Sequence, residues 1–251
     1  MAFLHGTIGP AARAAVWCAG GVDYRGELQR IPRDEWRAYL TAHSGLPGPR
    51  GNLELADVVT SVATREQIME LAALDDEYLR FCGTQALGRL LAEDPTDDSI
   101  RGMLHSRASE PLWRVREAVA RALQVAGDAA PSILATIAAD WITDPDPYVR
   151  RAALAAVCEP RLLTTEVQRA DALRLCSLAT GSILATPLTD RRDAALRNLR
   201  QALGYCWSVA IAADPERGVP LFERLRTVDD SDAKWIVASN LTKARLRRVL
   251  A

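Results

Sequence analysis

The 251-residue sequence has few aromatic residues and almost no lysine. It contains three Phe, five Tyr and six Trp, and its only lysines are Lys234 and Lys243. A chain that is poor in aromatic and β-branched residues but rich in Ala, Leu and Arg is not expected to form extensive sheet. No stretch approaches the roughly 20 uncharged apolar residues that a membrane span needs. We therefore expect an all-α protein with no membrane partner, and cytoplasmic is the default location.

Motifs for metal, nucleotide or nucleophilic chemistry are also missing. The five cysteines are scattered, with no CxxC pair and no His nearby, which favours reduced thiols and no zinc site. The sequence has no glycine-rich phosphate loop, no GxSxG elbow and no HExxH pair. We therefore expect neither a metal nor a cofactor.

Charge is spread unevenly along the chain. The formal net charge is −1, yet residues 1–100 carry 9 basic against 15 acidic side chains, and residues 101–251 carry 22 against 17. Nearly all the positive charge is Arg, whose planar fork recognises carboxylates and phosphates. A GC-rich genome that encodes Arg in place of Lys explains the same bias, so the composition alone leaves the partner open.

One pattern recurs along the chain. An apolar residue is followed by Arg, and Ala-Leu or a close relative stands seven and eight positions after the first residue. Clear copies begin at Leu79, Val115 and Val149, and weaker copies begin at Ala195 and Trp235. The intervals are 36, 34, 46 and 40 residues, close to the roughly 40–47 of paired-helix repeats. The pattern predicts a series of helix pairs.

Acidic and proline residues precede several of these copies. They occur at 75–77, 144–147 and 229–232. Asp caps a helix N-terminus, and Pro is tolerated in the first helical turn. Each copy should therefore open the second helix of its pair.

The repeated Asp…Val-Arg…Ala…Ala-Leu pattern resembles the consensus of the HEAT-repeat family. This resemblance implies an α-solenoid, a superhelical stack of antiparallel helix pairs, over residues 64–251. Residues 1–63 are expected to form capping helices continuous with the stack as a single domain. Within this cap, helices at 32–44 and 52–63 flank a Pro/Gly turn at 46–51, and residues 1–30 either add a capping helix around Ala11–Cys18 or are partly disordered.

Arg and aromatic residues cluster in the repeats and supply the candidate binding residues. A ladder of guanidinium groups at repeat spacing suits a phosphate backbone, and aromatic side chains beside it could stack on bases. Alternatively, as the HEAT resemblance implies, Arg80, Arg116 and Arg150 pair with Asp residues of adjacent repeats, and the Trp side chains pack between helices. The candidates are Trp113, Arg114, Arg116, Trp141, Tyr148, Arg150, Arg151, Trp235, Lys243 and Arg245.

A narrower resemblance concerns the stretch from Trp141 through Tyr148 to Leu154. It resembles a repeat on the DNA-binding face of the HEAT-like DNA alkylation-repair glycosylases. That family also uses one catalytic Asp, and the corresponding segment here, residues 112–117, has no Asp. Glu117 is the only substitute candidate for a carboxylate that stabilises a cationic transition state. The resemblance implies a relationship and leaves catalysis in question.

Three functions follow from these observations. The first is a non-catalytic HEAT protein that binds duplex DNA. The second is a protein-interaction scaffold that holds a helix or peptide, with its acidic first hundred residues facing a basic partner. The third is a DNA glycosylase that acts on alkylated purines.

Overall fold

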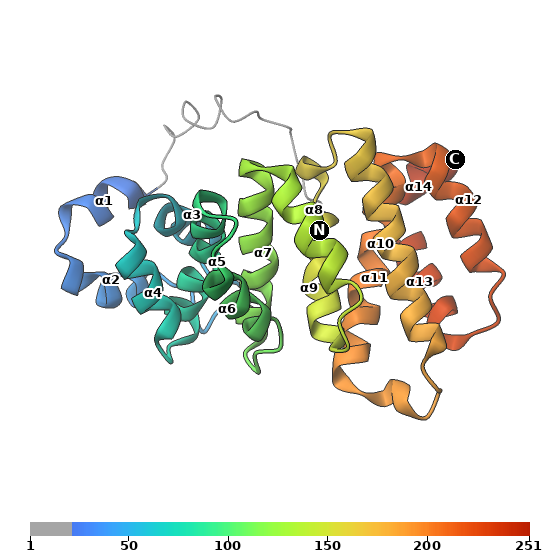
Figure 1. Ribbon diagram of the computed structural model, residues 1–251, viewed down its shortest axis with the longest axis horizontal. Helices are drawn as coiled ribbons and strands as arrows, with labels where there is room; N and C mark the ends of the chain where they lie inside the picture. Colours follow the sequence, from blue (N-terminus) through green and yellow to red (C-terminus); the bar gives the residue numbers. More distant parts are fainter. Residues whose placement is uncertain (1–21) are drawn as a thin grey trace.

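The computed structural model describes residues 22–251, and this part of the chain is all-helical (Figure 1). No strand occurs between residues 22 and 251, which confirms the all-α prediction for this range. Within the same range, no helix is long and apolar enough to cross a membrane. The capping helix expected around Ala11–Cys18 lies outside the described residues.

The N-terminal helices bracket the predicted Pro/Gly turn. In that turn the Leu46–Pro47 peptide bond is cis and Gly45 has a φ of +73°, a backbone conformation that favours glycine. Asn52 then caps the next helix by accepting a hydrogen bond from the Leu55 N–H at 3.0 Å. The elements are α1 (Tyr24–Arg30), the 3₁₀ turn η1 (Arg33–Glu35), α2 (Trp36–Ala42), α3 (Leu53–Val62) and α4 (Arg65–Ala73).

Each copy of the sequence repeat opens a helix. Asp76, Asp146 and Asp230 cap three of these helices with their side chains, as the acidic punctuation predicts. The five helices are α5 (Glu77–Glu93), α7 (Trp113–Ala129), α9 (Pro147–Val157), α11 (Ala194–Ala213) and α13 (Ser231–Leu241). Between and after them lie α6 (Asp98–Ala108), α8 (Pro131–Trp141), η2 (Pro160–Leu162), α10 (Glu166–Ala185), η3 (Asp190–Arg192), α12 (Pro215–Arg226) and α14 (Ala244–Leu250).

The repeat helices pack in chain order. Helix α5 contacts α7, α7 contacts α9, α9 contacts α11, and α11 contacts α13. The alternate helices cover them, with α4 on α5, α6 on α7, α8 on α9, α10 on α11 and α12 on α13. Figure 1 shows the resulting row of helices, which follows the chain from α1 at one end to α12 and α14 at the other.

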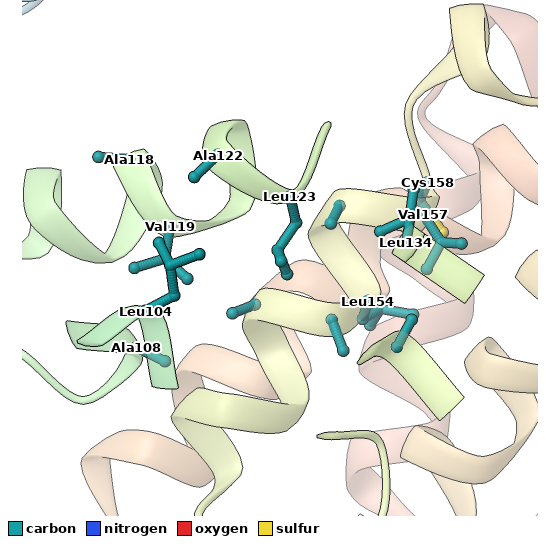
Figure 2. Packing of buried hydrophobic residues seen from close by; sticks show 14 of the residues in the cluster. Leu104, Ala108, Ala118, Val119, Ala122, Leu123, Leu134, Leu154, Val157 and Cys158 are labelled. Carbon is teal, nitrogen blue, oxygen red and sulfur yellow. The ribbon is translucent and has the colours of Figure 1, made fainter. Parts of the chain in front are cut away.

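Small residues allow the repeat helices to approach closely. A Cβ atom at Gly88 of α5 would overlap the backbone of Ala122 in α7, and one at Gly83 would overlap the backbone of Ala72 in α4. Longer apolar side chains fill the space beneath the helices, and in Figure 2 Val119 of α7 lies against Leu104 of α6. The series of helices thus shares one continuous apolar core.

A buried amide joins the last repeat helices. Asn240 of α13 is fully buried, donates to the Leu203 carbonyl at 2.9 Å and accepts from the Ser208 N–H at 2.8 Å. Both partners are backbone groups of α11. Because a buried polar group without partners is costly, this pair of bonds fixes how α13 lies on α11.

Candidate binding groove

An open groove of about 570 Å³ crosses α7, α9 and α11. We call it the α9 groove because α9 lies between the other two helices. Its wall mixes aromatic, charged, amide and small side chains. It is lined by Trp113, Glu117, Ala120, Arg121, Gln124, Arg151, Ala155, Cys158, Glu159, Asn198, Gln201, Ala202, Tyr205 and Cys206.

The register of the repeat places several of these side chains. Glu117 and Arg151 each stand two positions after the apolar residue that begins a copy. Arg121 and Ala155 each stand six positions after it, and Gln201 does so in the weaker copy. These positions are one turn apart on a helix, so they form a stripe on one face. Part of the α9 groove is therefore built from equivalent positions of successive repeats.

The first ion pair of the groove joins α9 to α7. The Arg151 guanidinium donates to the Glu117 carboxylate and also to the Arg116 backbone carbonyl at 3.4 Å. The Arg151 side chain is 11% exposed, whereas that of Glu117 is 42% exposed. The guanidinium is thus covered by protein, and the carboxylate is the end of the pair that solvent reaches.

A second charged cluster spans three helices. Arg121 of α7 donates to the Gln85 side-chain oxygen of α5 at 2.6 Å and to the Asp57 carboxylate of α3 at 2.5 Å. Gln85 itself donates to Asp57 at 2.7 Å. Again the carboxylate is the outer group, with Asp57 60% exposed and Arg121 28% exposed.

Two aromatic side chains of the groove are exposed. Trp113 at the start of α7 is 50% exposed, and Tyr205 of α11 is 41% exposed. Each has a guanidinium over its ring: Arg114 lies 4.6 Å from the Trp113 ring centroid, and Arg245 lies 4.7 Å from that of Tyr205. These contacts orient the rings and leave part of each apolar face open.

The arginines of the repeat pattern itself face the loops before their own helices. Arg80 donates to the Leu74 carbonyl at 2.7 Å and Arg150 to the Pro145 carbonyl at 3.3 Å. Arg116 donates to the carbonyls of Glu110 and Pro111. Burial lowers the pKa of the Arg150 guanidinium. These guanidinium groups satisfy loop carbonyls between the two helices of a pair.

Carboxylates of neighbouring elements hold two further arginines. Arg80 pairs with Glu110 at 3.0 Å, in the loop before α7. Arg114 pairs with Glu77 of α5 at 2.9 Å and also donates to the Gly48 carbonyl at 3.2 Å. Arg80 is thus paired with a carboxylate of the next repeat, as the alternative prediction expects, although the partner is Glu110 and not an Asp. Arg114 is also paired with a carboxylate of a neighbouring repeat helix.

The remaining candidates lie outside the wall of the α9 groove. Trp141 is buried, with the His105 ring edge-on at 5.3 Å, so it belongs to the core between α6 and α8. Tyr148 lies under Arg116, whose guanidinium carbon is 4.6 Å from the ring centroid. Trp235 of α13 carries Arg200 over its ring at 4.8 Å. Lys243 is half-buried at the start of α14.

The candidates brought together by the fold are therefore Trp113, Glu117 and Arg151, with Arg114 and Arg245 behind the aromatic rings. Sequence reasoning missed Asp57, Gln85, Arg121 and Tyr205. The register of the repeat carried a signal for Gln85 and Arg121, which both stand six positions after the start of a copy.

Among residues 22–251, no group of three or more His, Cys, Asp or Glu side chains is placed to hold a metal ion.

Comparison with known proteins adds little. No protein-family model and no curated protein matches the sequence. The chain aligns with two engineered proteins whose crystal structures come from a structural genomics consortium. One is 15% identical, with a TM-score of 0.38 over 91% of this chain and 99% of the other. The second is 14% identical, with a TM-score of 0.35 over 90% and 96%.

Proposed function

We propose that the chain is a HEAT-type α-solenoid that acts as a protein-interaction scaffold, and that its α9 groove holds a basic segment of another protein. The solenoid is supported by two contacts that each join the same position of adjacent repeats. Arg151 meets Glu117, and Arg121 meets Gln85, each across one repeat. Stacked repeats with the same interface would produce this pattern.

Glu159, the other carboxylate that lines the groove, pairs with Arg161 at 3.0 Å, and these two side chains are about equally exposed. The observation that carries the choice of partner is the exposure of two other ion pairs, Glu117–Arg151 in the groove and Asp57–Arg121 beside it. In both, the carboxylate is more exposed than the guanidinium. A ligand in the groove therefore meets the Glu117 carboxylate before the Arg151 guanidinium, and one that extends past Arg121 meets Asp57 beside the groove. Charges of opposite sign across an interface steer association and favour the right partner, so Lys and Arg side chains suit this wall.

The exposed rings suit the same partner. Trp113 and Tyr205 offer large apolar faces, and such residues dominate the energy of protein interfaces. An aromatic face also attracts the cationic head of a Lys or Arg side chain and packs against its apolar stem. Carboxylates and aromatic rings on one wall thus favour a basic peptide with apolar positions.

Duplex DNA stays a prediction with weaker support. The arginines expected to form a phosphate-binding ladder are engaged by loop carbonyls or carboxylates. A phosphate backbone in the α9 groove would approach Asp57 and Glu117, which repel it. Base excision also stays a prediction, and the carboxylate it would need at Glu117 is engaged by Arg151.

Fluorescence anisotropy can test this proposal. The probes are two fluorescein-labelled peptides that share their apolar residues and differ only in having Lys or Glu at the polar positions, together with a labelled DNA duplex. We expect the Lys peptide to bind and the Glu peptide not to bind. Trp113→Ala should weaken the binding of the Lys peptide on the order of tenfold, because a central aromatic contact is lost.

The matched control is Val167→Ala, which removes an exposed apolar side chain of α10 that does not line the groove. It should leave the affinity for the Lys peptide unchanged. Tight binding of the duplex together with no binding of the Lys peptide would refute the scaffold proposal and restore DNA as the partner.

A further inference from the structure

Three cysteines gather where α9, α10 and α11 meet. Cys158, which ends α9, and Cys206 of α11 both line the α9 groove, and Cys176 of α10 lies behind them. All three are free thiols and buried. The Cys158 and Cys176 sulfur atoms are 3.8 Å apart and in hydrogen-bond contact.

We propose that Cys158 and Cys176 form a modification site, a thiol pair that oxidises to an intramolecular disulfide at the floor of the α9 groove. A disulfide requires the two sulfur atoms to approach to about 2.05 Å. The remaining approach is modest because the two side chains already face each other. Cys158 also stands at the C-cap of α9. Its N–H still bonds the Leu154 carbonyl, but the α-helix does not continue beyond it and the η2 turn follows.

The position of the pair sets the order of the two steps. Cys158 faces the groove and is 3% exposed, whereas Cys176 is fully covered. A small oxidant that enters the groove, such as hydrogen peroxide, therefore reaches Cys158 before Cys176, and Cys206, which is 2% exposed, also lines the groove. Cys176 lies within contact distance of Cys158 and can therefore act as the resolving thiol.

The chemistry balances with peroxide as the oxidant. The Cys158 thiolate attacks one peroxide oxygen, the O–O bond breaks, and the departing hydroxide takes up the Cys158 proton to leave as water. The resulting sulfenic acid is attacked at sulfur by the Cys176 thiolate. The S–S bond forms, the S–O bond breaks, and the hydroxide released takes up the Cys176 proton as a second water. The two thiols lose two electrons, which reduce the peroxide.

The environment makes this reaction slow at neutral pH. The contact with Cys176, together with burial, raises the pKa of Cys158, and burial raises that of Cys176. The thiolate is the reactive form, so the rate should increase as the pH rises. The thiol pair should therefore respond to prolonged exposure to peroxide rather than to a brief pulse.

The test is a disulfide map of the full chain. The folded protein is treated with hydrogen peroxide at mildly alkaline pH, free thiols are blocked, and the digest is analysed by mass spectrometry. We expect a peptide in which Cys158 is linked to Cys176. Cys82 should be recovered as a blocked thiol, because it is buried on α5 and its contacts among the described residues include no other thiol.

Two variants sharpen the test. Cys176→Ala should let the Cys158 sulfenic acid accumulate, where dimedone traps it, and Cys206→Ala should leave the Cys158–Cys176 link intact. The proposal is overturned if both thiols are recovered free, if Cys158 links to Cys206 or Cys18 instead, or if Cys158 passes to sulfinic acid while Cys176 is present. The disulfide map of the protein without substitutions tests the Cys158–Cys176 link even if a variant does not fold. Its outcome does not depend on what occupies the groove.

Discussion

Arg151 and Glu117 stand at the same position of adjacent repeats, and the guanidinium of one meets the carboxylate of the other between α9 and α7. The pair serves two purposes. It fixes the register of two neighbouring helices, and it covers the positive charge while leaving the negative charge at the groove surface. The same arginine that suggests phosphate binding in the sequence is thus engaged by a carboxylate in the folded chain.

A double-mutant cycle should detect this pair in the stability of the protein. Arg151→Met keeps the apolar stem, and Glu117→Gln keeps the shape of the carboxylate. Since Glu117 is partly exposed and screened by solvent, we expect a coupling free energy of about 0.5–1 kcal/mol from urea unfolding. If the two single losses add to within roughly 0.3 kcal/mol, the pair is not coupled.

Two tryptophans should differ sharply in their contribution to stability. Trp141→Ala should cost about 3–5 kcal/mol of unfolding free energy, because the side chain is buried and its removal leaves a cavity. Trp113→Ala should cost about 0.5 kcal/mol, because half of the side chain is already exposed. The midpoint of urea unfolding measures both. Similar losses for the two variants would show that Trp113 is a core residue and unsuited to ligand contact.

Close packing of α5 on α7 predicts that a single methyl group is not tolerated there. Gly88→Ala should lower the unfolding free energy by about 1–3 kcal/mol, because the new Cβ would overlap the Ala122 backbone. The matched control is Gly102→Ala in α6, where a Cβ meets nothing within 4 Å. That variant should instead gain about 0.5–1 kcal/mol from the improved helix propensity. Equal responses of the two variants would contradict the close approach of α5 and α7.

Stability should fall at alkaline pH because of the buried thiols. Burial raises the pKa of Cys82 to about 12, whereas an unfolded cysteine titrates near 8.5. Below pH 8.5 the thiol is protonated in both states and its contribution to stability is complete. As the pH rises towards 12, only the unfolded state releases the proton, so this contribution is lost by about 1.4 kcal/mol per pH unit.

The comparison is between the unmodified sequence and Cys82→Ala under reducing conditions. The variant should lose stability less steeply between about pH 8.5 and 10 because it lacks one titrating group. Parallel curves for the two proteins would show that the Cys82 thiol titrates alike in the folded and unfolded states.

Helix positions could be predicted from the sequence because the signals are local. Asp76, Asp146 and Asp230 each cap the helix that directly follows, and a capping bond spans only two or three residues. The turn at 46–51 likewise follows from a Pro/Gly run that cannot continue a helix. The helix α7 is an exception, since its N-cap Leu112 has no capping side chain and only the repeat frame marks its start.

The composition of the groove could be predicted only in part, because the contacts that hold Arg151 and Arg121 join residues that lie 34 or more positions apart. Whether Arg151 faces phosphate or Glu117 depends on how α9 sits against α7, which no local pattern determines. Uneven repeat spacing adds a second difficulty. The 46-residue interval before α11 brings in Asn198, three positions after Ala195, where the other copies place no residue that lines the groove.

The proposal that the α9 groove recognises a basic segment is tested most directly by the affinity of the Lys peptide for a variant that lacks two exposed carboxylates, Glu117 in the groove and Asp57 beside it. Asp57→Asn with Glu117→Gln preserves the shape and keeps one acceptor oxygen at each position while removing both negative charges. The control is Glu223→Gln, which removes a similarly exposed carboxylate from an ion pair with Arg226 on α12. We expect the double variant to bind the Lys peptide on the order of tenfold more weakly, with the control unchanged. An unchanged or higher affinity of the double variant would contradict the proposal that the groove recognises a basic segment.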